Sequence, residues 1–274
     1  MKLPDLYHML SAQEKKIIRG LAQKKKRLHH GLFLAEGPKT IAELIETFPC
    51  RLLVGTEEGF QALQQVYRLR TPLEVLWRKI AKIVCLPEHY DFASLSQLQH
   101  PQPLIALFQL PSAGETPLPT SAALLLDAVA DPGNVGTILR TCDWFGIRDV
   151  YYTDGTADPF SPKVVQASMG SIARVHLYPC TGVDFVDRAK KERIPILGGV
   201  LEGKDIFALS KSLPRLSDPM LLILGNEGNG ISKEIRKRLT HPLFIPAASS
   251  SPQARPESLN VAISLAILLT LLRS

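Results

Sequence analysis

The chain has 274 residues, of which 45% are hydrophobic and 21% are charged. This composition describes a folded globular protein of one large or two ordinary domains and excludes an intrinsically disordered chain. The formal net charge of +6 is unevenly distributed: residues 1–110 contain 15 Lys and Arg against 10 Asp and Glu, whereas residues 111–274 contain 17 against 16. The basic N-terminal part suits an anionic partner such as nucleic acid, although many ordinary domains carry a similar charge.

Four widely spaced cysteines form no CxxC pair: Cys50, Cys85, Cys142 and Cys180. Their spacing argues against a zinc site and against a disulfide framework, so we expect no metal and a reducing, cytoplasmic location. The most apolar segment, Leu259 to Leu272, is shorter than the roughly 20 residues that span a bilayer. It predicts a buried C-terminal helix and no membrane partner, and the N-terminus lacks the apolar core of a signal peptide.

Residues 1–108 predict a small α/β domain. Ser11 and Glu14 form a capping-box pattern before a helical stretch that continues to His30. The expected elements that follow are a strand at 32–37, a helix at about 38–48, a strand at 51–55, a helix in the sixties and a strand near Leu104. Residues 71–85 give no clear prediction. Residues 109–120, which are rich in proline and small polar residues, predict an exposed linker.

Residues 121–274 alternate more regularly between apolar strands and helices. Strands are expected at 122–127, 149–153, 173–178, 194–200, 220–225 and 241–246, and helices at 136–145, 161–169, 183–192, 232–239 and 258–272. Nearly continuous apolar strands separated by helices predict a parallel sheet that is covered on both faces. Ligands of such sheets bind beyond the carboxyl ends of the strands, in the loops that follow Leu126, Leu224 and Ile245.

These three loops have unusual sequences: DAVADPGNVGTILR, LLILGNEGNGIS and IPAASSSPQARPESLNVAI. The glycines at 225, 228 and 230 match neither GxGxxG nor the P-loop pattern, which disfavours a dehydrogenase, a Rossmann-type methyltransferase and a nucleotide-phosphate enzyme. Glycines after a strand are often only turn residues. They also allow the backbone to approach a ligand closely, with Glu227 at the rim of the site.

Together, the loops resemble motifs 1, 2 and 3 of the SpoU-type (TrmH-type) RNA ribose methyltransferases of the SPOUT superfamily. The motifs are NxGxxxR at Asn134–Arg140, GNEGxG at Gly225–Gly230 and SLNVA at Ser258–Ala262, and SMGS at Ser168–Ser171 resembles a further family segment. The resemblance implies methyl transfer from S-adenosylmethionine to a ribose 2′-hydroxyl of rRNA or tRNA. It also implies a C-terminal domain with a deep trefoil knot, a homodimer through that domain, and an N-terminal substrate-binding α/β domain like ribosomal protein L30e.

By the same resemblance, the cofactor would contact Gly225, Asn226, Ile245, Pro246 and Leu259. Ile245 and Leu259 could equally be plain core residues. A guanidinium is a poor proton acceptor at neutral pH, so an electrostatic role on the alkoxide or an RNA phosphate suits the motif 1 arginine, Arg140, better than the role of base.

The other polar motif residues complete the predicted active site. Asn134 would hold the arginine or the ribose, and Glu227 would pair with Arg140 or bind the RNA. Ser258 and Asn260 would complete the polar wall, although Asn134 and Ser258 could instead cap helices. The loop at 247–257 is longer than is usual in the family and makes the role of Ser258 less secure.

The best candidates for RNA capture are the basic residues Lys24, Lys25, Lys26, Arg27, His29 and His30. Such side chains would contact phosphates without sequence choice, although a lysine run is often only a solvated helix face. The N-terminal domain favours rRNA over tRNA as the substrate. The alternative function is a catalytically silent RNA-binding member of the same fold.

Overall fold

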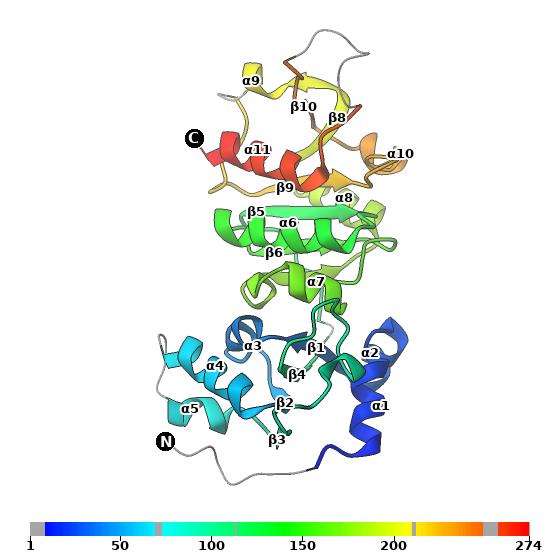
Figure 1. Cartoon of the computed structure of the whole chain (residues 1–274). Helices are drawn as coiled ribbons and strands as arrows, with labels where there is room; N and C mark the ends of the chain where they lie inside the picture. Colours follow the sequence, from blue (N-terminus) through cyan, green and yellow to red (C-terminus); the bar gives the residue numbers. More distant parts are fainter. Residues whose placement is uncertain (1–8, 69–72, 113, 210–211, 249–256, 274) are drawn as a thin grey trace. The chain divides into compact units, whose positions relative to one another are not determined.

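The computed structural model describes residues 9–68, 73–112, 114–209, 212–248 and 257–273. The chain folds into two compact units (Figure 1). The N-terminal unit consists of Met1–Ser112 together with Asp158–Arg174, and the C-terminal unit consists of Ala113–Ala157 together with Val175–Ser274. The chain therefore passes between the units three times, whereas the sequence predicted one linker between two continuous domains.

The N-terminal unit is a mixed four-stranded sheet with helices. Its elements are α1 (Ala12–Gly20), α2 (Lys24–His30), β1 (Leu32–Glu36), α3 (Pro38–Leu44), β2 (Cys50–Gly55), α4 (Glu57–Arg68), α5 (Leu73–Arg78), β3 (Ile83–Cys85), η1 (Phe92–Ser94), β4 (Leu104–Gln109), α7 (Pro162–Ala167) and η2 (Ser171–Ala173). The strand order is β1-β4-β2-β3, in which only β2 and β3 pair in parallel.

Most expected elements of this unit are present, with one difference at the start. The capping box of Ser11 and Glu14 begins α1 as predicted. The basic stretch is not one helix, however, because α1 ends at Gly20 and α2 starts afresh at Lys24. Between them the backbone N–H of Leu21 still bonds to α1, whereas Gln23 is extended.

The segment Asp158–Arg174 belongs to the N-terminal unit, although it lies in the sequence between two strands of the other unit. Its Phe160 is buried against Phe33, with ring centroids 5.1 Å apart, and against Phe48 at 6.3 Å. Arg174 forms an ion pair with Glu43 at 2.5 Å. The predicted helix at 161–169 is present as α7, but aromatic packing places it with the N-terminal core instead of the C-terminal sheet.

The C-terminal unit contains a six-stranded sheet. Its elements are β5 (Ala122–Asp127), α6 (Pro132–Phe145), β6 (Asp149–Tyr152), β7 (His176–Pro179), α8 (Gly182–Lys191), β8 (Ile196–Asp205), α9 (Ile206–Leu209), β9 (Met220–Gly225), α10 (Lys233–Arg236), β10 (His241–Phe244) and α11 (Val261–Arg273). The strand order is β10-β8-β9-β5-β6-β7 and every pair is parallel, as the sequence predicted. All six carboxyl ends therefore lie along one edge.

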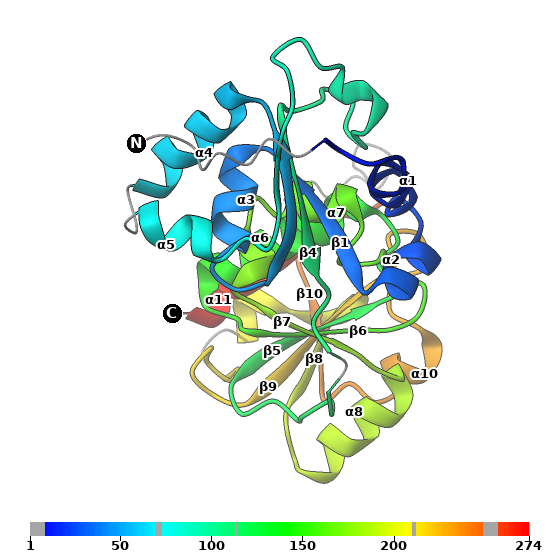
Figure 2. The same cartoon turned by 90° about the horizontal axis from the view of Figure 1, so that it is seen from below.

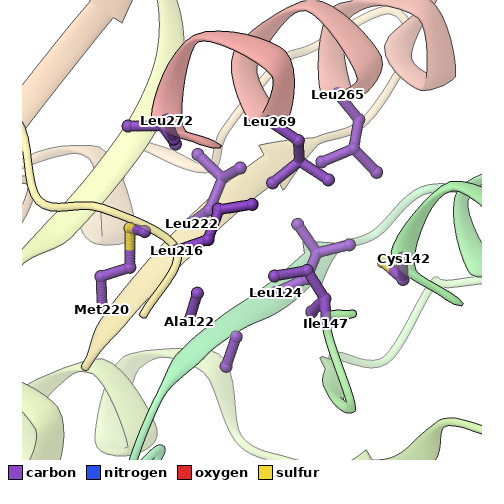
Figure 3. A pocket seen from close by; sticks show the side chains of 11 residues that line it. Ala122, Leu124, Cys142, Ile147, Leu216, Met220, Leu222, Leu265, Leu269 and Leu272 are labelled. Atoms are coloured by element: carbon purple, nitrogen blue, oxygen red, sulfur yellow. The ribbon is translucent and has the colours of Figure 1, made fainter. Parts of the chain in front are cut away.

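Both faces of this sheet are buried at its centre, where β5 is buried along its whole length and β9 over all but its last residue. Successive side chains of a strand point to opposite faces, so these two strands contribute to two core layers. Leu125 and Ile223 belong to a core cluster that includes Phe185 of α8. Leu124 and Leu222 point to the opposite face, which is covered by α6 and α11 (Figure 1). There they line a small apolar pocket with Leu265, Leu269 and Leu272 of α11 (Figure 3). None of the predicted site residues lines this pocket, so it is a packing feature of the core.

The stretch predicted as an exposed linker is attached to the C-terminal unit over part of its length. The hydroxyl of Tyr151 donates to the carbonyl of Pro117 at 3.0 Å, and the hydroxyl of Thr116 donates to the carbonyl of Pro179 at 3.1 Å. Leu118 packs against the core cluster. Three prolines and small residues suggested exposure, but these local contacts fix residues 116–118 on the fold.

The strands of the C-terminal sheet fan out when the molecule is seen from below, with α8 and α10 on one side of them (Figure 2). Across the described ranges, no helix combines the length and the apolar character that crossing a membrane would require.

Candidate active site

The loops that leave β5 and β9 are joined through the carboxylate of Glu227. Its Oε2 accepts the backbone N–H of Ala130 and its Oε1 accepts that of Asp131, both at 3.1 Å. Oε1 also accepts the side-chain amide of Asn134 at 3.0 Å. One carboxylate thus binds two donors of the β5–α6 connection and one from the first turn of α6, and it holds two motifs together.

Asn260 connects the third motif to the same group. Its amide Nδ2 donates to Oδ1 of Asn134 at 2.9 Å, while its own Oδ1 accepts the N–H of Ala262 at 2.9 Å. Asn134, Glu227 and Asn260, which are separated by up to 126 residues, therefore form one hydrogen-bonded cluster. The sequence placed all three in one site.

Other residues perform the capping roles considered for Asn134 and Ser258. Asp131 caps α6, because its Oδ1 accepts the N–H of Asn134 at 2.8 Å. The side chain of Asn260 binds the first free N–H groups of α11. Ser258 is exposed, and within the described ranges it makes no hydrogen bond.

The loop between β9 and α10 is a tight backbone structure. Asn226 and Gly230 pair their backbones in both directions, at 3.0 and 2.8 Å. A side chain at Gly225 would collide with the backbone of Gly230 and Ile231, so only glycine fits there. The side chain of Asn226 binds the N–H groups of Gly228 and Asn229 through Oδ1. Within GNEGNG, Gly225 therefore serves a close backbone approach, whereas Gly230 has a φ of +66°, a left-handed conformation that favours glycine.

The β5–α6 connection begins with a strained residue. Ala128 has a φ of +57°, a left-handed backbone conformation that residues other than glycine rarely adopt. Its N–H donates to the Thr153 hydroxyl at 3.0 Å, and its carbonyl accepts the amide of Asn226 at 2.9 Å. Strain of this kind persists where surrounding bonds enforce it, and it often marks a functional site.

Glu227 is ionised at neutral pH. Partial burial by itself raises the pKa of this carboxyl, but the hydrogen bonds from Asn134 and from the backbone N–H groups of Ala130 and Asp131 prevail and lower it. The carboxylate is therefore a fixed acceptor in the cluster and is unsuited to donate a proton.

The structure does not bring Arg140 to this cluster. Arg140 is exposed on α6, six residues after Asn134, which places it about 120° around the helix and roughly 9 Å along it. Among the residues that the structure describes, none forms a hydrogen bond or an ion pair with Arg140. The predicted pair of Glu227 and Arg140 is absent, because Glu227 binds the β5–α6 loop instead.

The predicted cofactor residues lie on the same edge of the sheet. Gly225 and Asn226 are half-buried at the end of β9, and Ile245 and Pro246 are half-buried after β10. Only β8 separates these strands, so their ends are roughly 10 Å apart. Leu259 is 48% exposed immediately before Asn260.

Partly open apolar side chains beside backbone polar groups suit an adenine and a sulfonium better than they suit phosphates. The residues present therefore fit S-adenosylmethionine. Within the described ranges, no cluster of three or more metal-ligating side chains occurs.

The predicted RNA-binding residues divide into two groups. Lys24, Lys25 and Lys26 are exposed, as is His29, whereas His30 is half-buried. Arg27 is only 2% exposed, so its prediction as an RNA contact is wrong for this conformation.

The side chain of Arg27 turns inward. It forms an ion pair with Asp158 at 2.5 Å and donates to the carbonyl of Leu21 at 2.7 Å. Sequence reasoning missed Asp158, which lies 131 residues away from Arg27 and has no local signal. It also missed Asp131, although an Asp before a Pro at the start of a helix is a known capping pattern.

Comparisons with known proteins agree with the geometry. The SpoU rRNA Methylase family matches residues 121–270, and the MRM3-like substrate binding domain matches residues 13–106. The 23S rRNA (guanosine(2553)-2′-O)-methyltransferase RlmP of Bacillus subtilis (strain 168) is 31% identical over 265 residues, covering 95% of this chain and 96% of that protein.

Two solved structures extend this similarity over nearly the whole chain. A Porphyromonas gingivalis protein, provisionally assigned as an RNA methyltransferase of the TrmH family, is 45% identical with a TM-score of 0.84, covering 97% of this chain and 99% of that one. An AdoMet-bound rRNA methyltransferase from Sinorhizobium meliloti is 26% identical with a TM-score of 0.77, covering 96% and 95%. The chain therefore belongs to the SpoU rRNA methylase family.

Proposed function

We propose that the chain transfers a methyl group from S-adenosylmethionine to a ribose 2′-hydroxyl of structured ribosomal RNA. Its family makes it an S-adenosylmethionine-dependent RNA 2′-O-methyltransferase. The choice of rRNA over tRNA is supported by the relatives from Bacillus and Sinorhizobium, which are rRNA methyltransferases. The observation that carries the proposal is the cluster of Asn134, Glu227 and Asn260, which joins the three motif loops at one edge of the sheet.

The proposed cofactor site uses Gly225, Asn226, Ile245, Pro246 and Leu259. Their backbone groups and apolar side chains would hold the adenine and the methionine part. When bound, S-adenosylmethionine supplies a methyl group that is activated by the positive sulfur. The protein must then hold the ribose oxygen in line with the methyl carbon and the sulfur, so positioning contributes much of the rate.

The proposed catalytic residues have different tasks. The cluster of Asn134, Glu227 and Asn260 would hold the three motif loops in fixed positions relative to one another. Ser258, which is exposed next to this cluster, would contact the ribose. Arg140 would stabilise the negative charge that develops on the 2′-oxygen or hold a neighbouring RNA phosphate. The hydroxyl proton would leave to solvent or to an RNA phosphate oxygen, because a guanidinium does not accept it.

We also propose a homodimer through the C-terminal domain. Trp144 on α6 is 81% exposed and Ile263 on α11 is 53% exposed, and these two helices pack against each other. Such exposed apolar side chains on adjoining helices suit a protein partner. Because Arg140 lies on the same helix as Trp144, a second copy could complete the active site around it.

The remaining proposals concern the frame of the enzyme. Residues 1–108 would bind the RNA substrate through an L30e-like fold. Residues 109–120 would link this domain to residues 121–274, which would catalyse the methyl transfer. A deep trefoil knot in the C-terminal domain is proposed from the membership of the family. An experimental chain trace through residues 246–260 would test the knot. The four free cysteines suit a reducing cytoplasm.

Two measurements test the proposed function. Mapping of 2′-O-methyl groups in cellular RNA, with and without this gene, is expected to show the loss of a ribosomal site. Loss of a tRNA site instead would correct the substrate. Calorimetry with S-adenosylmethionine separates the enzyme from a silent RNA-binding member: absence of binding at high protein concentration would overturn the proposal.

A further inference from the structure

Asp127 is a buried carboxylate that lies outside the three motifs. It is the last residue of β5 and is 6% exposed. Its Oδ2 accepts the backbone N–H of Ser232 at 2.7 Å. Its Oδ1 lies 3.4 Å from the hydroxyl of Thr153, which also reaches two backbone carbonyls. In the part of the chain that the structure covers, no cation pairs with Asp127, so the bond to Ser232 is its main compensation for burial.

This bond fixes the far end of the loop that carries Glu227. The near end of the loop is held by the sheet, where Gly225 of β9 lies opposite Asp127 itself. The residue after Gly225 is also held, because the side-chain amide of Asn226 donates to the carbonyl of Ala128. Between these points Gly228 to Gly230 are exposed, whereas Ile231 is buried in the same core cluster as Leu125 of β5. The bond to Asp127 is therefore the polar attachment of this stretch to the end of β5, next to the apolar contact of Ile231.

We propose that Asp127 is a positioning residue for the methyl transfer, which acts through the N–H of Ser232 on the loop 225–232. The proposal rests on the function proposed above. Burial of a carboxylate is unfavourable unless it is hydrogen-bonded, and an apolar residue would suit the end of a buried strand better if only stability mattered. The loop that Asp127 holds is exposed from Glu227 to Gly230, so the bond affects the geometry of Glu227 and Gly225 more than the stability of the core.

The bond can be removed from either side. Ser232 has φ of −55°, which proline can adopt. Ser232→Pro therefore deletes the N–H donor, whereas the matched variant Ser232→Ala deletes only the side chain. Asp127→Leu deletes the acceptor, and Asp127→Asn keeps an acceptor oxygen without the charge.

Calorimetry of the full-length wild type with S-adenosylmethionine comes first, since it tests the proposed function independently of Asp127. Ser232→Pro and Asp127→Leu are each expected to weaken cofactor binding by about tenfold or more, and to lower kcat as well, because each breaks a hydrogen bond to a charged group. Their double variant should be no worse than either one alone, since both remove the same bond. Asp127→Asn and Ser232→Ala should remain within about threefold of the wild type.

Amide hydrogen exchange measures how firmly the loop 225–232 is held in the protein without cofactor. The amide of Gly230 donates to the carbonyl of Asn226 at 2.8 Å. It should exchange faster in Ser232→Pro and Asp127→Leu, and at the wild-type rate in Ser232→Ala. The inference is overturned if Ser232→Pro folds with unchanged exchange and unchanged cofactor affinity, or if the two single effects multiply in the double variant. If Asp127→Leu fails to fold, the pair of Ser232 variants still decides the matter.

Discussion

Helix α2 and the strand-end loops of the C-terminal unit were both selected from the sequence for their polar residues, but they use those residues differently. In the loops, Asn134, Glu227 and Asn260 come from distant positions and bind one another. On α2, four consecutive basic residues lie in different environments, because Lys24 to Lys26 are exposed whereas Arg27 is buried.

The difference has a geometric cause. The carboxyl ends of parallel strands share one edge, so the residues that follow them converge whatever their distance in sequence. On a helix each residue turns by about 100°, so four adjacent side chains cannot share one face. Proximity in sequence thus says little about a common role on α2, whereas distance in sequence is no obstacle to one in the loops. Each of the following variants can break or sharpen this contrast.

The largest effect is expected from Asp158→Ala. This variant leaves the buried guanidinium of Arg27 without its counter-ion, and breaking a buried pair in this way costs about 3–5 kcal/mol of unfolding free energy. Urea denaturation measures the loss. The matched control is Lys26→Ala on the exposed side of the same helix, which should stay within about 0.5 kcal/mol of the wild type. Equal stability of the two variants would mean that Arg27 is solvated in solution and belongs with the lysines after all.

Replacing the pair by apolar residues refines this prediction. Arg27→Met combined with Asp158→Leu removes both charges, so no unpaired ion remains buried. Much of the stability lost in Asp158→Ala should return in this double variant, as it does for other buried pairs that are replaced by apolar residues.

Arg140→Ala is expected to have the next largest effect. Loss of a charge that stabilises the reacting oxygen should lower kcat by at least about 100-fold. The affinity for S-adenosylmethionine should stay within a few fold, because Arg140 lies away from the loops that are proposed to bind it. Lys191→Ala, which removes an exposed cation on α8, is the control. A fully active Arg140→Ala would remove this residue from the mechanism and leave the loop cluster as the whole catalytic centre.

The C-terminal sheet was predictable because its central strands, β5 and β9, are short apolar runs buried on both faces, and such runs between helices are typical of a parallel sheet. The cluster was predictable because three loops with special sequences follow three of those strands. The roles of its members were less accessible. Glu227 has neighbours in sequence that are glycines and asparagines, and nothing local indicates that it binds Ala130 and Asp131 instead of Arg140.

The segment Asp158–Arg174 shows why other features could not be predicted. Its helical pattern was visible, but the aromatic partners of Phe160 are Phe33 and Phe48, more than 100 residues earlier. The family comparison likewise includes this segment in the match at 121–270, although its contacts belong to the N-terminal unit. Which core an amphipathic helix joins depends on tertiary packing, and its own sequence does not contain that information.

Glu227→Gln tests the loop half of the contrast with a smaller change. The amide nitrogen of Gln cannot accept a hydrogen bond, so at least one N–H of Ala130 or Asp131 would face another donor. We expect a loss of about tenfold in kcat/KM. Glu227→Asp, which keeps the charge but shortens the reach, should show whether the position of the carboxylate matters as well as its charge.

The pH dependence of Glu227 has a definite sign. Although burial opposes it, the hydrogen bonds of Glu227 lower its pKa in the folded protein, so its contribution to stability is complete above the ordinary carboxyl pKa. That contribution is lost as the pH falls through the lowered value. The variant Glu227→Gln should lack this acid-dependent component in unfolding measurements. If the unfolding free energy of the wild type and of Glu227→Gln depended on pH in the same way, the carboxylate would not hold the loops.

The smallest effect concerns the exposed side of α2. Lys25→Ala with Lys26→Ala should weaken RNA binding by only a few fold, since each exposed lysine binds one phosphate at most. The slope of log affinity against log salt should become shallower by about 0.7 for each phosphate of single-stranded RNA that is no longer neutralised, and kcat should be unchanged.

The double variant Lys190→Ala and Lys191→Ala on α8 makes the same change of net charge and should leave that slope unaltered. If both double variants make the slope equally shallow, the RNA responds to net charge alone. Helix α2 would then lose its assignment as an RNA-binding surface, while the ion pair of Arg27 with Asp158 would keep its structural role.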